Sequence, residues 1–123
     1  LPVTQETTGM CNREFFGKCR KGSYFINTSR GELVDDEALL EALQNGTIAM
    51  AGLDTLDHEP VQKDHPMLSW PKEVLDRIVF SPHIGGITGS SFRRGYGMIW
   101  DDIEKVAKGE VPGHIVNWKE LEQ

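Results

Sequence analysis

The sequence lacks the signals that assign many small proteins to a class. Its 123 residues include two cysteines, Cys11 and Cys19, and no CxxC pair, so neither a disulfide framework nor a cysteine-rich zinc site is expected. No apolar run approaches the roughly 20 residues of a membrane-spanning helix. The first residues do not follow the basic-then-apolar pattern of a signal peptide. These absences favour a soluble, cytoplasmic protein with no membrane contact.

Positive charge is also scarce. Lys and Arg together number 13 against 19 Asp and Glu, which gives a formal net charge of −6, and the basic residues are dispersed along the chain. A protein that binds a phosphate backbone needs a surplus of Lys and Arg, so nucleic acid is not expected as a partner. The histidines show no ligand-like spacing with the cysteines, and no metal site is predicted.

The segments that are present alternate between strands and helices. Residues 23–27, 47–53 and 78–80 are short apolar segments bounded by glycine or polar turns, which predicts strands; the strand at 47–53 is expected to be buried on both faces. Asn12 and Asp35 are predicted N-caps of two helices, one running to about residue 19 and one ending at Asn45-Gly46. A third helix is expected from about 90 to 108, and residues 57–77 are expected to form a long loop with at most one helical turn.

This order predicts an α/β fold with a parallel sheet. Three strands and three helices make about half of a doubly wound sheet, and no GxGxxG occurs that could form a phosphate-binding turn. We therefore predict a partial Rossmann-like parallel sheet, the C-terminal half of a dinucleotide-binding domain, over residues 1–87. A long helix and tail, residues 88–123, would follow, and the tail carries Trp118, which needs contacts that this chain does not supply. The N-terminal half of the enzyme is expected to lie outside this sequence.

Three chemically useful side chains follow the three predicted strands: Arg30, Glu59 and His83. The carboxyl ends of parallel strands are where ligands bind in such sheets. An arginine can hold an anion, a histidine can move a proton, and a carboxylate bonded to the histidine fixes its tautomer and favours the imidazolium.

Each of these residues could also have an ordinary structural role without any part in catalysis. Arg30 would be an exposed arginine at a helix entrance, Glu59 a solvated loop acid, and His83 a hydrogen-bonded loop histidine. Of the neighbouring residues, Asp57 competes with Glu59 for the same role, while His58 and His65 are assigned to the surface. Asp54, at the end of a buried strand, needs a partner such as a carboxamide or backbone N–H groups.

Three ordered motifs carry a resemblance to a known family. They are the string from Ile26 to Asp35 (INTSRGELVD), the string Ala51-Gly52-Leu53-Asp54 with Glu59-Pro60 after it, and the string from Ser81 to Gly86 (SPHIGG). Together they resemble the D-isomer-specific 2-hydroxyacid dehydrogenases. The opening Leu1-Pro2-Val3-Thr4 resembles that family's stretch after the fourth strand, and the similarity continues to about Asn117.

The resemblance implies a role for each matching residue. It implies that Arg30 binds the substrate carboxylate and carbonyl, that His83 is the general acid/base, and that Glu59 is its partner. It also implies a set of cofactor-binding residues. Thr28 and Ser29 would line the nicotinamide ribose side, and Asp54 would meet the nicotinamide carboxamide. Ile84, Gly85 and Gly86 would close over the nicotinamide ring beside Arg30 and His83, and Leu1 and Pro2 would lie near the adenosine side.

The function implied by the resemblance is the interconversion of a 2-keto acid and a D-2-hydroxy acid by hydride transfer, with NAD or NADP as the cofactor. We expect the 123-residue chain to be inactive without the N-terminal half, and homodimerisation is possible because it is common in the family. The alternative is a non-catalytic binding or regulatory module derived from the same fold.

Overall fold

The computed structural model describes residues 1–116. Two compact units make up the chain, the first being Leu1–Gly85 and the second beginning at Gly86, and each is described by itself below. No helix among the described residues is both long enough and apolar enough to cross a membrane. Trp118, in the tail, lies outside the described residues.

The first unit alternates helices and strands in the predicted order. Its elements are α1 (Arg13–Gly17), β1 (Ser23–Asn27), the 3₁₀ helix η1 (Gly31–Leu33), α2 (Asp36–Gln44), β2 (Ile48–Leu53), the 3₁₀ helix η2 (Pro66–Ser69), α3 (Lys72–Leu75) and β3 (Ile78–Phe80). The side chain of Asn12 accepts a hydrogen bond from the amide of Phe15, and that of Asp35 accepts one from the amide of Ala38. Both predicted N-caps are therefore confirmed.

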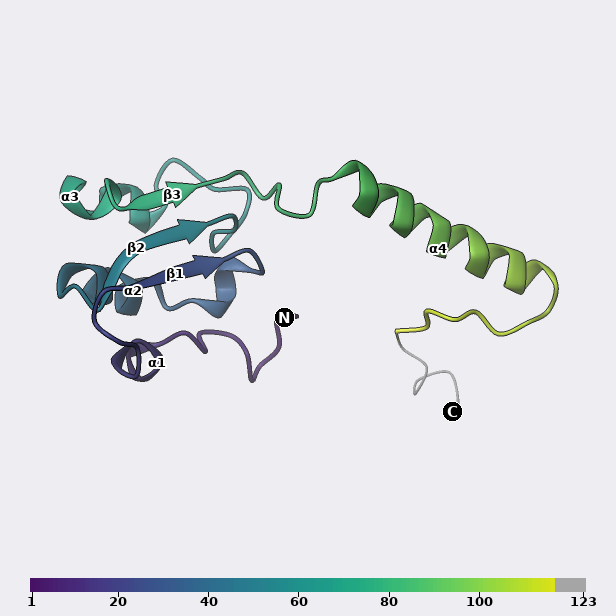
Figure 1. Cartoon of the computed structure of the whole chain (residues 1–123), viewed down its shortest axis with the longest axis horizontal. Coiled ribbons are helices and arrows are strands. Elements are labelled where there is room, and N and C mark those ends of the chain that lie inside the picture. Colours follow the sequence, from purple (N-terminus) through teal and green to yellow (C-terminus); the bar gives the residue numbers. More distant parts are fainter. Residues whose placement is uncertain (117–123) are drawn as a thin grey trace. The chain divides into compact units, whose positions relative to one another are not determined.

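The three strands form one parallel sheet in the order β1-β2-β3. In Figure 1 their arrowheads point the same way. Asn27, Leu53 and Phe80 lie side by side at the last position of each strand. This register confirms the predicted α/β architecture, and it brings the three segments that follow the strands to one edge of the sheet.

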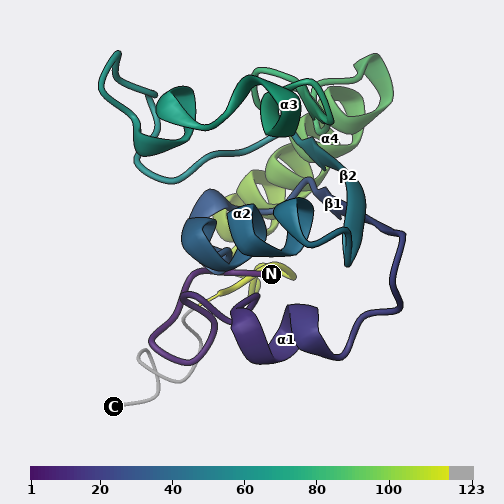
Figure 2. The same ribbon diagram turned by 90° about the vertical axis from the view of Figure 1, so that its left-hand side faces the viewer.

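The core of the first unit lies on one face of this sheet. Helix α2 contacts β2, α1 and α3, and Figure 2 shows α2 on one side of the strands. Leu39 and Leu43 of α2 are fully buried. The buried hydrophobic residues that make up this cluster are Phe16, Ala38, Leu39, Ala42, Leu43, Ile48, Ala51, Leu53, Met67, Val74 and Ile78.

The opposite face of the sheet is bare within the first unit. Tyr24 pairs with Met50, and Ile26 lies in register with Gly52 and Val79. The side chains of Tyr24, Ile26 and Val79 are more than 60% exposed, and Met50 is 37% exposed. The prediction that residues 47–53 are buried on both faces is therefore wrong within this unit, since no other segment of the unit covers the second face.

The segment after β2 is more ordered than the sequence analysis expected. It contains two short helices, η2 and α3, instead of one helical turn at most. Met67 of η2 and Val74 of α3 pack these helices against the core, and each of the two residues is 1% exposed. His65 is the N-cap of η2: its Nδ1 accepts a hydrogen bond from the amide of Met67, and the residue is 7% exposed. The assignment of His65 to the surface is therefore wrong.

The second unit consists of helix α4 (Gly89–Ala107) and the segment after it. A capping box between Thr88 and Ser91 starts the helix. Asp102 accepts hydrogen bonds from the amide of Gly113 and from Nδ1 of His114, at 2.7 and 2.9 Å, which ties the following segment back to the helix. The helix predicted for residues 90–108 is confirmed to within one residue. Its apolar stripe is exposed within the unit, at Phe92, Tyr96, Ile99, Ile103 and Val106.

Candidate active site

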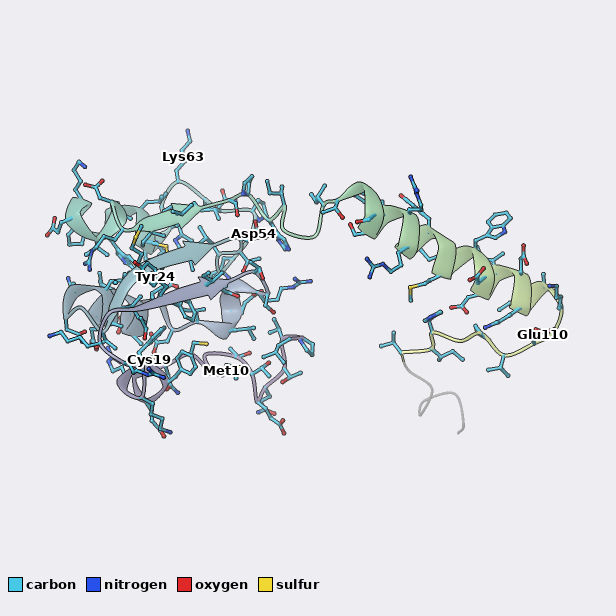
Figure 3. All side chains as sticks on the ribbon, viewed as in Figure 1. Met10, Cys19, Tyr24, Asp54, Lys63 and Glu110 are labelled. Atoms are coloured by element: carbon cyan, nitrogen blue, oxygen red, sulfur yellow. The ribbon has the colours of Figure 1, made fainter. Side chains whose placement is uncertain are left out.

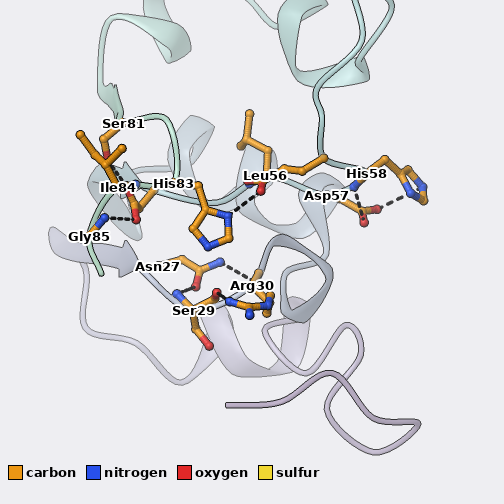
Figure 4. A network of polar contacts seen from close by, with 12 residues as sticks. Asn27, Ser29, Arg30, Leu56, Asp57, His58, Ser81, His83, Ile84 and Gly85 are labelled. Atoms are coloured by element: carbon orange, nitrogen blue, oxygen red, sulfur yellow. Dashed lines mark hydrogen bonds and ion pairs between the residues drawn. The ribbon is translucent and has the colours of Figure 1, made fainter. Parts of the chain in front are cut away.

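A network of polar contacts joins the three segments that leave the carboxyl edge of the sheet. Asp54 lies directly after β2 (Figure 3). Its amide donates to the carbonyl of Asn27 at the end of β1 at 2.9 Å, and its carboxylate accepts from the hydroxyl of Ser81, directly after β3. In Figure 4 the imidazole of His83 is seen between Leu56, on the segment after β2, and the turn that bears Asn27 and Arg30, while Asp57 and His58 face each other to one side.

Asn27 shapes the turn that carries Arg30. It is 6% exposed. Its Nδ2 donates to the carbonyl of Arg30 at 2.7 Å, and its Oδ1 accepts from the amide of Ser29 at 3.0 Å. An Asn side chain that bonds the backbone two or three residues ahead is a common way to fix a tight turn. Sequence reasoning did not single out Asn27, although an Asn at a strand end before a short polar segment is a usable signal.

Arg30 projects from this turn as an exposed side chain. Its Nη1 donates to the carbonyl of Ser29 at 2.7 Å, which uses one of the five N–H donors of the guanidinium group. Its positive charge is one of the influences that lower the pKa of Glu59. Arg30 therefore lies within electrostatic reach of the Glu59 carboxylate, and among the described residues its guanidinium bonds the Ser29 carbonyl alone.

Glu59 and His83 are joined by a short hydrogen bond. Oε2 of Glu59 lies 2.6 Å from Nδ1 of His83, and Oε1 accepts the amide of Leu56 at 2.9 Å. The hydrogen bond to His83 is the main cause that holds the pKa of Glu59 below its ordinary value, followed by the Leu56 amide. An ionised carboxylate can only accept hydrogen bonds, so Nδ1 of His83 carries a proton. Nε2 is therefore the ring nitrogen that this hydrogen bond leaves free.

The backbone of His83 is held in an uncommon conformation. Its φ angle is +54°, in the left-handed region that residues other than glycine seldom adopt. Its amide donates to the carbonyl of Asp54 at 2.8 Å. Such a conformation persists where the surroundings fix it and is frequent at functional sites.

Asp54 is buried and anchors the segment around His83. Its Oδ1 accepts from the hydroxyl of Ser81 at 2.5 Å and from the amide of Ile84 at 3.0 Å, and its Oδ2 accepts from the amide of Gly85 at 2.7 Å. The Ser81 hydroxyl is the largest of the causes that lower the pKa of Asp54, ahead of the two amides. These donors are the partners that the sequence analysis required for an acid at the end of a buried strand.

The same geometry fits the nicotinamide end of a dinucleotide. A carboxylate accepts about four hydrogen bonds, so Asp54 keeps one acceptor position for an amide group. At Gly85, a Cβ atom would lie 2.8 Å from Oδ2 of Asp54, so only glycine leaves the backbone free to approach this carboxylate. The described residues thus suit a carboxamide, while a phosphate-binding glycine turn is not part of this sequence.

An apolar cavity of about 550 Å³ adjoins the Glu59–His83 pair. Both residues line it, with Asp54 and Ser81. The rest of its wall is apolar and consists of Leu56, Pro60, Val61, Met67, Leu68, Phe80 and Pro82. The polar groups of the site therefore border an apolar cavity.

The remaining predicted residues lie as follows. The hydroxyl of Ser29 donates to the carbonyl of Leu1 at 3.1 Å, which places Leu1 against the turn after β1. Pro2 is exposed, and its carbonyl accepts the hydroxyl of Thr7. Thr28 and Ile84 are exposed as well. Gly86 begins the second unit, where its carbonyl accepts the hydroxyl of Ser91.

The residues set aside in the sequence analysis form a pair of their own. His58 is exposed, and its Nε2 lies 3.4 Å from Oδ2 of Asp57. Asp57 therefore does not take the place of Glu59 beside His83. Among residues 1–116, no group of three or more His, Cys, Asp or Glu side chains is arranged to hold a metal ion.

Comparisons with known proteins agree with this geometry. The model of the D-isomer specific 2-hydroxyacid dehydrogenase, NAD binding domain, matches residues 1–85. Glyoxylate reductase of Thermofilum pendens is 38% identical over 117 residues, which are 95% of this chain and 33% of that protein. Glyoxylate/hydroxypyruvate reductase B of Klebsiella pneumoniae is also 38% identical, over 95% of this chain and 35% of that protein. The chain thus spans about a third of the length of these relatives.

Solved structures show the same relationship. The D-lactate dehydrogenase of Lactobacillus jensenii with NAD⁺ matches 95% of this chain and 38% of its own, at a TM-score of 0.74 and 31% identity. A D-isomer specific 2-hydroxyacid dehydrogenase of Xanthobacter autotrophicus Py2, in complex with NADPH and MES, matches 95% of this chain and 44% of its own, at a TM-score of 0.74 and 33% identity. The chain belongs to the D-isomer-specific 2-hydroxyacid dehydrogenase family, through that family's NAD-binding domain.

Proposed function

We propose that the intact protein is an NAD(P)-dependent oxidoreductase that interconverts a 2-keto acid and a D-2-hydroxy acid. The observation that carries this proposal is the 2.6 Å contact between Glu59 and His83 at the strand edge that also bears Arg30. Membership of the family supports the reaction class. The relatives that reduce glyoxylate or hydroxypyruvate, by their names, support a small 2-keto acid as the substrate.

His83 moves the proton in this reaction. In the direction of reduction, the imidazolium gives its Nε2 proton to the carbonyl oxygen of the keto acid, which becomes the hydroxyl of the product. In the direction of oxidation, neutral Nε2 removes that proton. Glu59 keeps Nδ1 protonated and stabilises the charged ring. The nicotinamide cofactor, when bound, supplies or accepts the hydride.

Arg30 holds the substrate. Its free guanidinium donors can bind the carboxylate in a two-pronged manner, and their charge polarises the adjacent carbonyl. Asp54 and the backbone at Gly85 would hold the carboxamide of the cofactor, with Ile84 and Gly86 beside them. Thr28, Ser29, Leu1 and Pro2 are proposed to line the rest of the cofactor site.

We further propose that the intact protein contains a preceding segment that completes the nucleotide-binding domain. In the first unit, β1 pairs only with β2, and the face that bears Tyr24, Ile26, Met50 and Val79 is exposed. Parallel sheets are normally covered on both faces. The apolar stripe of α4 would contact the substrate domain. The share of the relatives that this chain matches, about a third, supports this proposal.

The test begins with the mass of the natural polypeptide, compared with the 13.8 kDa of this sequence. The intact protein is then assayed for oxidation of NADH and NADPH with glyoxylate, hydroxypyruvate and pyruvate. We expect turnover with at least one of them, and we expect His83→Ala to abolish turnover while the affinity for the keto acid changes little. His58→Ala is the control, because this exposed histidine contacts Asp57 and not Glu59.

A natural polypeptide of 13.8 kDa with no turnover would refute the enzyme proposal and leave a binding or regulatory module. A larger protein whose turnover survives His83→Ala would refute the acid–base assignment only. Each result therefore separates the reaction class from the role of one residue.

A further inference from the structure

The carboxylate of Asp54 holds both sides of the turn that carries His83. Its donors are Ser81, which precedes His83 in the chain, and the amides of Ile84 and Gly85, which follow it. The carbonyl of the same Asp54 accepts the amide of His83 at 2.8 Å. One buried residue therefore binds four of the five residues from 81 to 85.

This turn needs such a support. With a φ angle of +54°, His83 occupies a backbone region that is unfavourable for a side chain with a Cβ atom. Released from its contacts, the residue would relax toward an ordinary conformation and carry its imidazole away from Glu59. The position of the ring is therefore set by the groups that hold the backbone on either side of it.

Ser81 is the one side chain among these donors. The other hydrogen bonds to the Asp54 carboxylate come from backbone amides, whose positions follow the turn itself. The hydroxyl of Ser81, at 2.5 Å, is attached to the end of β3 and so connects the carboxylate to the sheet. It therefore fixes Oδ1 of Asp54 from the strand end of the turn. Ser81 is 27 residues away from Asp54 in the chain.

We propose that Ser81 is a positioning residue of the reaction: its hydroxyl locks the Asp54 carboxylate in the orientation that holds the turn 81–85 and thereby keeps His83 against Glu59. This inference rests on the acid–base role proposed above for His83. Asp54 then serves two purposes, because it supports the histidine turn as well as facing the carboxamide of the cofactor. The effect of Ser81 reaches the reaction through Asp54 and His83, without contact with the substrate.

Substitution of Ser81 separates the two purposes of Asp54. It removes the hydroxyl that supports the Asp54 carboxylate and leaves the carboxylate itself in the protein. In the intact protein, we expect Ser81→Ala to lower kcat by about tenfold or more, because small displacements of a catalytic group have large effects on rate. The Kd for NADH, measured by its fluorescence, and the KM for the keto acid should stay within about twofold. Ser81→Thr keeps the hydroxyl and should restore kcat.

Ser69→Ala is the matched control. Ser69 is also an exposed serine whose hydroxyl bonds a neighbouring group, the carbonyl of Pro66 in η2. It contacts neither Asp54 nor the turn, so we expect its kcat to equal that of the unsubstituted protein.

A spectroscopic readout makes the test independent of turnover. The Nδ1 proton of His83, hydrogen-bonded to Glu59, should give a downfield resonance in the proton NMR spectrum. We expect Ser81→Ala to broaden or remove it and Ser81→Thr to keep it. A resonance and a kcat that both survive Ser81→Ala would overturn the proposal. So would weaker NADH binding at an unchanged kcat, because Asp54 would then act on the cofactor alone.

The positioning role of Ser81 and the proposed function fail separately. A protein without dehydrogenase activity whose His83 resonance still depends on Ser81 would keep the positioning role and refute the proposed function. An active enzyme that is indifferent to Ser81→Ala would keep the function and refute the positioning role.

Discussion

Gly31 packs directly against the backbone of Leu56, so closely that a Cβ atom at position 31 would overlap the Leu56 carbonyl group and the amide of Asp57. Gly31 follows Arg30 at the end of the turn after β1, and Leu56 donates its amide to Glu59. The absence of a side chain at one position therefore sets how closely the arginine turn approaches the carboxylate segment.

From this contact we predict that Gly31→Ala separates the two segments. Overpacking of a close contact costs about 1–3 kcal/mol of the free energy of unfolding, and urea unfolding of the intact protein measures it. Gly17→Ala is the control: a Cβ atom at Gly17 would meet nothing within 4 Å, so this substitution should be neutral or slightly stabilising. Equal unfolding free energies for the two variants would contradict the prediction.

A second prediction concerns Arg30. Arg30→Lys replaces the planar donor group with a point charge and removes one charge-assisted hydrogen bond to the substrate carboxylate. The KM for the keto acid should rise about 10- to 100-fold, in line with the loss of one such bond, while the Kd for NADH changes little. Arg20→Lys, before the start of β1, is the matched control. An unchanged KM in Arg30→Lys would exclude Arg30 from substrate binding.

The features that could be predicted well from the sequence depend on residues that lie close together in the chain. Asn12 and Asp35 cap helices through amides three residues ahead, and such local signals are visible in a sequence. The face of β2 was misjudged because Ile48–Leu53 is apolar at every position, which hides the alternation between a buried and an exposed face. His65 is buried because Met67, two residues later, packs into the core, and no pattern of neighbouring residues predicts this burial.

The candidate site was predicted in part for the same reason. Arg30, Glu59 and His83 stand out as chemical groups after strands, and the family motifs identified them. The supporting residues were missed, because their roles depend on distant contacts. Ser81 donates a hydrogen bond to Asp54, and Gly31 leaves room for the backbone of Leu56. A serine and a glycine carry no signal of such roles in one sequence.

The Glu59–His83 pair leads to a prediction about pH. The pKa of Glu59 lies below its ordinary value of 4.5 because the carboxylate is bonded to His83, so the pair stays intact above that value and is lost as the pH falls through the lowered pKa. Glu59→Gln keeps a side-chain oxygen that can accept the Nδ1–H bond of His83 but has no ionisable group. The fall in rate that follows protonation of Glu59 on the acid side of the profile should therefore be present in the unsubstituted enzyme and absent in Glu59→Gln. Steady-state rates across the pH range measure this difference.

Asp57→Asn is the control for this experiment. Asp57 is a carboxylate of the same segment that faces His58 instead of His83, so its replacement should leave the pH profile in place. A profile that moves equally in both variants would mean that the general charge of the segment, and not the bond to His83, sets the pH dependence.

The last prediction concerns the second unit, where Asp102 ties the segment after α4 to the helix. The amide of Gly113 is the main cause that lowers the pKa of Asp102 from its ordinary value of 3.8, and His114 adds to it. The carboxylate therefore holds both groups above pH 3.8 and releases them as the pH falls through its lowered pKa. We expect Asp102→Asn to speed hydrogen exchange at the Gly113 amide roughly tenfold near neutral pH. The difference from the unsubstituted protein should vanish in acid. Asp101→Asn, at the adjacent exposed position, should leave this exchange unchanged, and equal acceleration in both variants would show that Asp102 does not hold the segment.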